Sequence, residues 1–495
     1  MLRHRMRFFL GCVLASVVAT LGCGGNDGKN PDPPPVPVSD VKGSIIDTHV
    51  TETGDVSSTR GPTNFEIAAI VKNQDGTPSE IFAVINADGT FVIPKVPEGP
   101  YDLRFVEFVN AGALPPRYVM NAPRDVDLGR IYVGRPDAAD ITIEPTNLSL
   151  TAMGMRPWVD GDVLEMFSLG SGAAGALVPT NGIYPKADDT ALTNYRVDMS
   201  QLLNPKLVDG SKGDTAFVTQ VAGVADPLLA PYQSVRKVFK PASFTQMDGT
   251  PTNLSGMFAD APARVWSADI DITAFNELKS AVHKDATVAG KNARIIAEPG
   301  GTRASTSITP NLLTCEALFI STFPSSFSYG NPFPSDWAEV GTLDVSYGVE
   351  HLAPTGISKS TVITIGQSGP IDTLTSPAKP LLSPPLDIKV NDMPAQDTLT
   401  GIGFSPTITF APPTIGTPAV YIIAIRKLDP GGGTTRTEAI FSTTDTTLQI
   451  PEGVLDFGYY YYFRVSVRAA FDINHPFKSG TTNAYASALT GVVTP

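Results

Sequence analysis

The stretch Ala87–Leu103, which reads ADGTFVIPKVPEGPYDL, decides the fold class of this chain. Its Asp88–Gly89 pair is typical of a tight turn, because glycine accepts a positive φ and aspartate bonds its own backbone. The run Thr90–Ile93 then has the residue types of a short strand. Pro97–Gly99 predicts another turn before a strand that begins at Tyr101. Turns and short strands in this order indicate an all-β protein.

The composition extends this prediction to the whole chain. Gly and Pro number 44 each among 495 residues, and only 17% of the residues are charged. Many turns and few amphipathic helices favour β-sandwiches. One helix is predicted at Thr273–His283, where apolar residues recur at helical spacing. The length predicts two to four domains, so we expect tandem β-sandwich modules.

The first predicted domain covers residues 41–139. Val41–Asp47 and Phe65–Val71 alternate like strands on either side of a turn-rich segment. Together with Ala87–Leu103 and a closing strand at Asp125–Ile131, they resemble the prealbumin-like, carboxypeptidase regulatory-like domain. The resemblance implies a seven-stranded sandwich, of a kind grouped with carbohydrate-binding-like folds, and implies little about function.

The last predicted domain, residues 391–495, resembles a fibronectin type III module. Ser405–Pro413 corresponds to its second strand, with Phe410 where the family usually keeps a core tryptophan. Tyr421–Ile425 corresponds to the third strand. The turn Leu455–Tyr461 places Tyr461 at the position of the family's tyrosine corner.

Residues 140–385 resemble no family known to us. Gly, Pro, Asn or Asp bound each of its apolar or alternating runs, which predicts one large β-sandwich or barrel. The predicted strands are Ile141–Ile143, Asp162–Phe167, Thr215–Val221, Ala263–Ile272, Ala293–Ala297, Leu312–Ile320, Val340–Tyr347 and Thr361–Ile365.

The N-terminus carries a targeting signal. Residues 1–22 hold a basic start and a fifteen-residue apolar run, which is shorter than the roughly 20 residues that span a bilayer. The run ends in Leu21-Gly22-Cys23 and resembles a bacterial lipoprotein signal, although Thr20 stands where leucine is usual. The resemblance implies acylation of Cys23, and Gly24 implies sorting to the outer membrane or cell surface. A Pro-rich tether follows within residues 23–40.

Charge and cysteine content restrict the possible partners. The net charge is −13, and a surface of this sign disfavours nucleic acid. Cys12 lies in the predicted signal peptide, so with Cys23 acylated only Cys315 remains as a thiol in the folded part. Its apolar neighbours predict a buried strand and an unreactive side chain.

Catalytic motifs are not evident, and we predict no catalytic residue, no metal ligand and no cofactor. The histidines are isolated in sequence, and Gly366–Pro370 departs from a nucleophile elbow. Three acidic groups could bind calcium, and the first two could also act as acid and base, although turns, loops and strand faces explain them as well. These groups are Asp160 and Asp162 with Glu165, Asp269 with Asp271, and the loop Asp209–Asp214.

The aromatic residues suggest where a ligand could bind. Trp158, Trp266 and Trp337 all fall in the central segment, and such rings either fill a core or stack on sugars. Tyr459–Tyr462 should alternate, which would leave outward rings for a protein contact. We therefore expect a non-enzymatic, membrane-anchored lipoprotein with a binding, adhesion or structural role, whose partner is a glycan or another envelope or extracellular protein. A carbohydrate-binding protein and a hydrolase with an acidic pair in the central domain remain alternatives.

Overall fold

The computed structural model describes residues 36–495 apart from 74, 110–111, 225–228, 319–321, 354, 357 and 430–433. Residues Val38–Pro495 form one compact unit. The predicted signal peptide and Cys23 lie outside the described residues. Within the described part the fold is all-β, as predicted, with only the short helices α1 (Ile272–Asn276) and α2 (Lys279–Val282) and three single 3-10 turns. No helix in that part is long and apolar enough to span a membrane.

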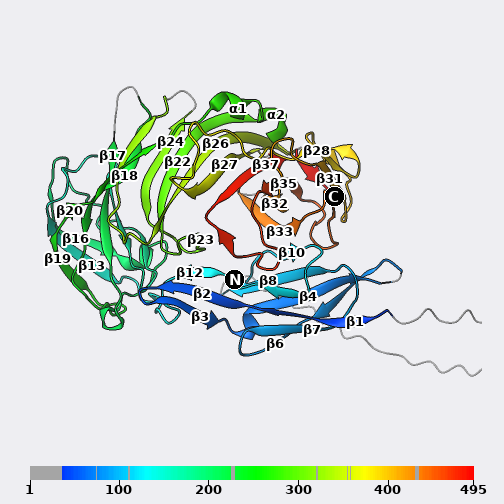
Figure 1. The fold of residues 1–495 in the computed structure, drawn as a ribbon, viewed down its shortest axis with the longest axis horizontal. Helices are drawn as coiled ribbons and strands as arrows, with labels where there is room; N and C mark the ends of the chain where they lie inside the picture. Colours follow the sequence, from blue (N-terminus) through cyan, green and yellow to red (C-terminus); the bar gives the residue numbers. More distant parts are fainter. Residues whose placement is uncertain are drawn as a thin grey trace, which may run out of the picture. The chain divides into compact units, whose positions relative to one another are not determined.

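One hydrogen-bonded sheet runs through all three predicted segments of the unit Val38–Pro495. Its strands are neighbours in the order β5-β4-β8-β10-β33-β32-β35-β37-β27-β26-β22-β24-β18-β17-β14-β15. Figure 1 labels the strands of this order from β4 to β17. Among the described strands of this sheet, the contacts of β10 with β33 and of β30 with β38 are parallel. The strands β9, β20, β30 and β38 attach at its sides.

The bounds of these strands are β4 (Phe65–Lys72), β5 (Pro78–Phe82), β8 (Asp102–Val109), β9 (Gly112–Ala113), β10 (Arg117–Val119), β14 (Val163–Phe167), β15 (Ala174–Ala176), β17 (Phe217–Val224), β18 (Tyr232–Phe239), β20 (Ala259–Asp260), β22 (Thr287–Glu298), β24 (Asn311–Leu318), β26 (Ala338–Leu352), β27 (Ser358–Pro370), β30 (Leu399–Thr400), β32 (Val420–Leu428), β33 (Thr435–Thr443), β35 (Tyr460–Arg468), β37 (Asn483–Leu489) and β38 (Val493–Thr494).

The N-terminal part of the unit is a sandwich. A second sheet of β11 (Asp125–Asp127), β1 (Val38–Ser44), β7 (Thr90–Pro97) and β6 (Val84–Ile85) shares one apolar cluster with β4 and β8. Gly43 lies in that core, where a Cβ would come within 2.4 Å of the Phe91 ring and 2.3 Å of the Val126 carbonyl oxygen. Only glycine therefore permits this approach of β1 to its neighbours. A smaller sheet joins β12 (Ile131–Val133), β2 (Ile46–Thr51) and β3 (Gly54–Thr59).

The C-terminal part is also a β-sandwich. The sheet β29 (Met393–Pro394), β28 (Leu386–Val390), β31 (Thr407–Ala411) and β34 (Thr447–Gln449) shares a core with β32, β33 and β35 of the large sheet. Phe410 packs in that core against Tyr421. The buried Tyr461 hydroxyl accepts a 2.8 Å hydrogen bond from the Asp456 N–H, which confirms the predicted tyrosine corner.

The central residues also form a sandwich. The sheet β16 (Ala191–Asp198), β13 (Asn147–Met153) and β19 (Thr252–Met257) shares an apolar cluster with β14, β17 and β18. Two-stranded sheets pair β21 (Ala263–Ser267) with β25 (Ser326–Gly330) and β23 (Arg303–Ala304) with β36 (Ser479–Gly480).

Several local predictions for the central residues were wrong. Ile141–Ile143 is not a strand, because the N–H groups of Thr142 and Ile143 donate to the Asp248 carboxylate and not to a neighbouring strand. The predicted helix is divided into α1 and α2. Its start is fixed by Asp271, whose carboxylate accepts from the Ala274 N–H.

The four-tyrosine run departs from simple alternation. Tyr461 and Tyr462 are both buried, at 0% and 2% exposure. Tyr462 is covered because its ring stacks on His351 of β26, with the centroids 4.0 Å apart. Tyr459 remains 36% exposed, and the Lys427 ammonium lies over its ring. The predicted outward pair is therefore limited to Tyr459 and the partly buried Tyr460.

Candidate functional site

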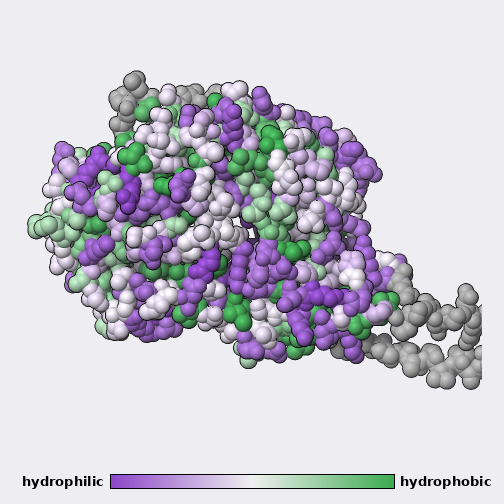
Figure 2. Space-filling view, in the orientation of Figure 1, coloured by the Kyte–Doolittle hydropathy of each residue, from purple (hydrophilic) through white to green (hydrophobic). Residues whose placement is uncertain are grey.

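A groove of about 630 Å³ lies beside the hairpin of β2 and β3, and we call it the hairpin groove. Strand β12 and the residues after it form one side, and loops of the central segment form the other. Its lining consists of Asp47, His49, Ser58, Thr59, Arg60, Tyr132, Val133, Gly134, Arg135, Pro136, Ser171, Leu203, Asn204, Lys206, Thr306, Ser307 and Ile308. In Figure 2, hydrophilic residues gather over the strands labelled β2, β8 and β4 in Figure 1.

Two aromatic rings lie side by side in this groove. Strands β2 and β12 pair in parallel, with His49 opposite Tyr132, so both side chains project from the same face. Their ring centroids are 5.5 Å apart and their planes differ by 25°. His49 Nδ1 lies 2.8 Å from the Gly134 carbonyl oxygen, which requires a proton on Nδ1. Nε2 lies 2.8 Å from the Ser58 hydroxyl oxygen, so hydrogen bonds on both nitrogens fix the ring in one orientation.

The arginines behind these rings are paired with carboxylates. Arg60 Nε lies 2.7 Å from an oxygen of Asp47, a side chain that is only 1% exposed. Arg60 and Arg130 each contact one oxygen of Glu107, at 2.7 and 2.6 Å. Burial raises the pKa of Asp47, and the hydrogen bond from the Arg130 N–H and the charge of Arg60 oppose that rise. The network is balanced, with two cations and two carboxylates.

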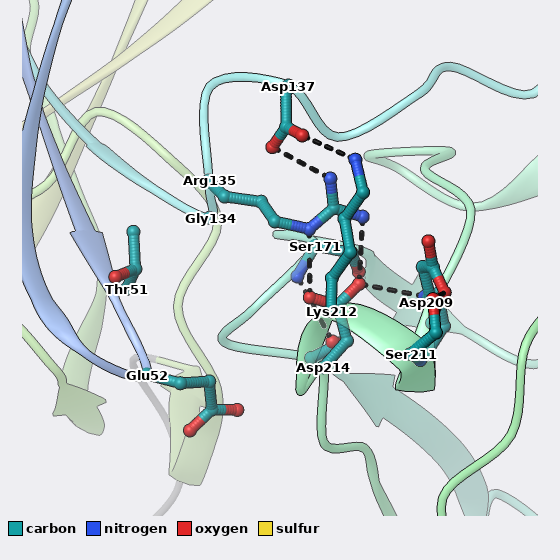
Figure 3. A network of polar contacts seen from close by, with 12 residues as sticks. Thr51, Glu52, Gly134, Arg135, Asp137, Ser171, Asp209, Ser211, Lys212 and Asp214 are labelled. Atoms are coloured by element: carbon teal, nitrogen blue, oxygen red, sulfur yellow. Dashed lines mark hydrogen bonds and ion pairs between the residues drawn. The ribbon is translucent and has the colours of Figure 1, made fainter.

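Figure 3 shows a second polar network at the other end of the groove. Arg135 donates to both oxygens of the buried Asp214, at 3.0 and 3.1 Å, and to Asp137 at 2.9 Å. The hydrogen bonds from Lys212 and Arg135 lower the pKa of Asp137 to about 2. A Cβ on Gly170 would come within 2.3 Å of Asp214, so the loop before β15 must carry glycine to reach this carboxylate.

This network explains the loop Asp209–Asp214, for which we considered calcium. One oxygen of Asp209 accepts from the N–H and hydroxyl of Ser211 and from Thr245. Asp214 accepts from Arg135 and from the Asp209 N–H. The carboxylates therefore stabilise the loop through protein donors. In the part of the chain that the structure describes, no group of three or more His, Cys, Asp or Glu could hold a metal ion.

The remaining polar groups of the hairpin groove are uncharged or paired. Asn204 donates to the Gly172 carbonyl oxygen at 2.6 Å, and the Ser307 hydroxyl oxygen accepts from the Val133 N–H at 2.8 Å. Lys206 pairs with Asp140 at 2.6 Å. The groove thus combines aromatic rings with hydroxyl and amide groups in fixed positions. A site of this composition suits an uncharged ligand with many hydroxyl groups.

The three tryptophans proposed as ligand residues lie in the core. Trp158, Trp266 and Trp337 are 4%, 5% and 6% exposed. Trp337 stacks on Phe333, with the centroids 5.1 Å apart, and Trp266 packs against Phe327. In this arrangement the rings contribute buried apolar area to the core.

The other candidate residues also have structural contacts. The buried Asp162 accepts from Gln220 at 3.0 Å and from the Val159 N–H at 3.2 Å, which closes the turn before β14. Asp269 and Asp271 do not share a strand face, because β21 ends at Ser267. Cys315 is fully buried in β24, as predicted, and burial raises the pKa of its thiol to about 11.

Sequence analysis missed the residues of the hairpin groove. His49 and Tyr132 are 83 positions apart, and only the parallel pairing of β2 with β12 brings them together. Alternation along Ile131–Val133 was the available signal, since it places Tyr132 on the face opposite to its two buried neighbours.

Comparison with known proteins adds little to these observations. No protein-family model and no curated protein matches the chain. The crystal structure of chicken CNTN1 FN1-FN3 domains is similar over 93% of this chain and 96% of that chain, at 8% identity and a TM-score of 0.16. A likeness at this TM-score supports no conclusion about function.

Proposed function

We propose that this protein is a non-enzymatic, lipid-anchored binding protein of the cell envelope and that its hairpin groove holds an uncharged glycan. The observation that carries the proposal is the paired His49 and Tyr132, held beside fixed hydroxyl and amide groups in a groove whose cations are paired. Sugar rings offer C–H faces to aromatic rings and hydroxyls to polar side chains. The prealbumin-like resemblance of residues 41–139 agrees with this ligand class.

The remaining modules act as supports in this proposal. The N-terminal sandwich carries β2, β3 and β12, and the fibronectin-like sandwich extends the same sheet through β33 and β10. Acyl chains on Cys23 would hold the protein at the outer membrane or cell surface, since each buried methylene contributes ~0.8 kcal/mol.

A glycan array tests the ligand assignment. The purified protein should retain a set of uncharged oligosaccharides, and Tyr132→Ala should weaken their binding by roughly 3–10-fold because one stacking ring is lost. Tyr184→Ala is the matched control, since Tyr184 is 51% exposed and lies outside the groove. Retention of no uncharged glycan, or equal losses in both variants, would refute the assignment.

Detergent partitioning tests the anchor separately. The native protein should enter the detergent phase, and Cys23→Ala should leave it in the aqueous phase. Continued partitioning of the variant into detergent would show that acylation of Cys23 is not the anchor.

A further inference from the structure

A second groove, of about 650 Å³, lies in the central part of the unit, away from the hairpin groove. We call it the bulge groove, and its lining consists of Met155, Arg156, Pro157, Val224, Val235, Arg236, Lys237, Asp260, Ala261, Ala263, Tyr329 and Gly330. Three of these residues are cations and one is an anion. In a chain with a net charge of −13, such a surplus of positive charge in one groove requires a separate explanation.

Arg236 owes its position to a β-bulge. In the pairing of β17 with β18, Gln220 faces Lys237 and Val221 faces Val235, so Arg236 is the extra residue with no partner across the ladder. A bulge redirects a side chain and is common beside binding sites. Its Nη1 donates to the Ser328 hydroxyl at 3.1 Å, and its buried Nε has no hydrogen-bond partner among the described residues.

Arg156 is positioned through its backbone. The Arg156 N–H donates to Gln220 Oε1 at 2.9 Å, and Gln220 Nε2 donates to the Arg156 carbonyl oxygen at 3.1 Å. Gln220 is fully buried and also binds Asp162 at 3.0 Å. These two hydrogen bonds from the Gln220 side chain fix the backbone of Arg156 at the groove. The Arg156 guanidinium has no ion-pair or hydrogen-bond partner in the described part of the chain.

The other charges do not neutralise the two arginines. Lys237 pairs with Asp260 at 2.9 Å, which cancels those two charges. Tyr329 directs its hydroxyl to Glu339, which also lies 3.6 Å from Arg264. Two guanidinium groups that have no carboxylate partner among the described residues therefore remain, those of Arg156 and Arg236. Planar guanidinium groups bind carboxylate and phosphate oxygens through paired hydrogen bonds.

We infer that the bulge groove is a binding site for an oxyanion, a carboxylate or phosphate group carried by a ligand, with Arg156 and Arg236 as its donors. The site does not depend on the glycan proposed for the hairpin groove. A uronic acid and a phosphorylated ligand both present negatively charged oxygens that a guanidinium can bind in pairs, so both are tested as sources of the group.

Isothermal titration of the purified protein tests this inference, with trigalacturonate and inorganic phosphate as anionic probes and maltotriose as the uncharged probe. The anionic probes should bind, and the double variant Arg156→Ala with Arg236→Ala should lose at least about tenfold in affinity for them, because both charged donors are removed. Tighter binding of trigalacturonate assigns a uronic acid glycan, and tighter binding of phosphate assigns a phosphorylated ligand.

The control variant is Arg196→Ala, which removes an exposed arginine of β16 outside the groove. It should bind the anionic probes like the native protein. Equal losses in Arg196→Ala would show that net charge alone attracts the probes, and native affinity in the double variant would show that these arginines are not the donors. Either result overturns the site. Unchanged thermal melting of the double variant shows that a loss of binding does not come from unfolding.

Discussion

The hairpin groove and the bulge groove contain the same type of cation in opposite surroundings. Arg60 and Arg135 in the hairpin groove each contact buried carboxylates, at 2.7 and 3.0 Å. Arg156 and Arg236 in the bulge groove have no carboxylate partner among the described residues. The guanidinium of a paired arginine already binds a carboxylate of the protein and stabilises the fold. The guanidinium of an unpaired arginine can bind an anionic group of a ligand instead. On this difference we base the proposals of an uncharged ligand for the hairpin groove and of an oxyanion for the bulge groove.

We expect the largest effect on the free energy of unfolding when one arginine is removed from each groove in turn. Arg60→Met leaves the buried Asp47 without its ion-pair partner, and the free energy of unfolding should fall by about 3 kcal/mol. Arg156→Ala leaves no carboxylate unpaired, and the loss should be under about 1 kcal/mol. Urea unfolding measures both values. Equal losses of unfolding free energy in the two variants would contradict the different pairing of the arginines in the two grooves.

Two histidines differ in the same way, because one has hydrogen-bond partners on its ring nitrogens and the other lacks one within the described part of the chain. His49 has a partner on each ring nitrogen, whereas Nε2 of the buried His351 has none among the described residues. Burial, with a smaller contribution from His283, lowers the pKa of His351 to about 4. The unfolded chain binds this proton near pH 6.5, so stability is lost as the pH falls from 6.5 towards 4.

The expected loss from His351 is about 2 kcal/mol between pH 7.5 and pH 5. Replacement by phenylalanine keeps a ring against Tyr462 and should remove most of this dependence. The titratable groups that face His351 are His283, the stacked Tyr462 and Lys359 across the strand pair, and Asp285, Lys284 and Asp397 act on His283. Urea unfolding at several pH values measures the slope, and an unchanged slope in His351→Phe would assign the acid sensitivity to other groups.

The smallest effect that we expect is that of the salt concentration on ligand affinity. Binding of trigalacturonate in the bulge groove should weaken about threefold or more between 0.05 and 0.5 M NaCl, because added ions screen the two arginines. Binding of an uncharged glycan in the hairpin groove should change by less than about 1.5-fold. Titrations at three salt concentrations test both values, and parallel salt dependence would contradict the different pairing of the cations.

Local signals in the sequence predicted much of the fold. Asp88–Gly89 and the residues after it predicted β7, the spacing before Tyr461 predicted the tyrosine corner, and the apolar neighbours of Cys315 predicted a buried strand. Each of these features depends on residues that are close in sequence. Ile141–Ile143 was mispredicted because a distant carboxylate, that of Asp248, binds its N–H groups.

Neither groove could be predicted in the same way. The hairpin groove requires parallel pairing of β2 with β12, and the bulge groove requires the register shift opposite Gln220 and Val221. Such pairings depend on the whole sheet and leave little local pattern in the sequence. The tryptophans were ambiguous for a related reason, since one ring can fill a core or contact a sugar, and burial alone distinguishes the two roles.

The most direct test asks whether the two grooves bind their ligands independently. Uncharged oligosaccharides retained on the array would be titrated into the protein with and without saturating trigalacturonate. We expect the same affinity for the uncharged ligand in both titrations and loss of trigalacturonate binding only in the variant that lacks Arg156 and Arg236. Displacement of one ligand by the other would contradict two separate sites that are distinguished by the pairing of their arginines.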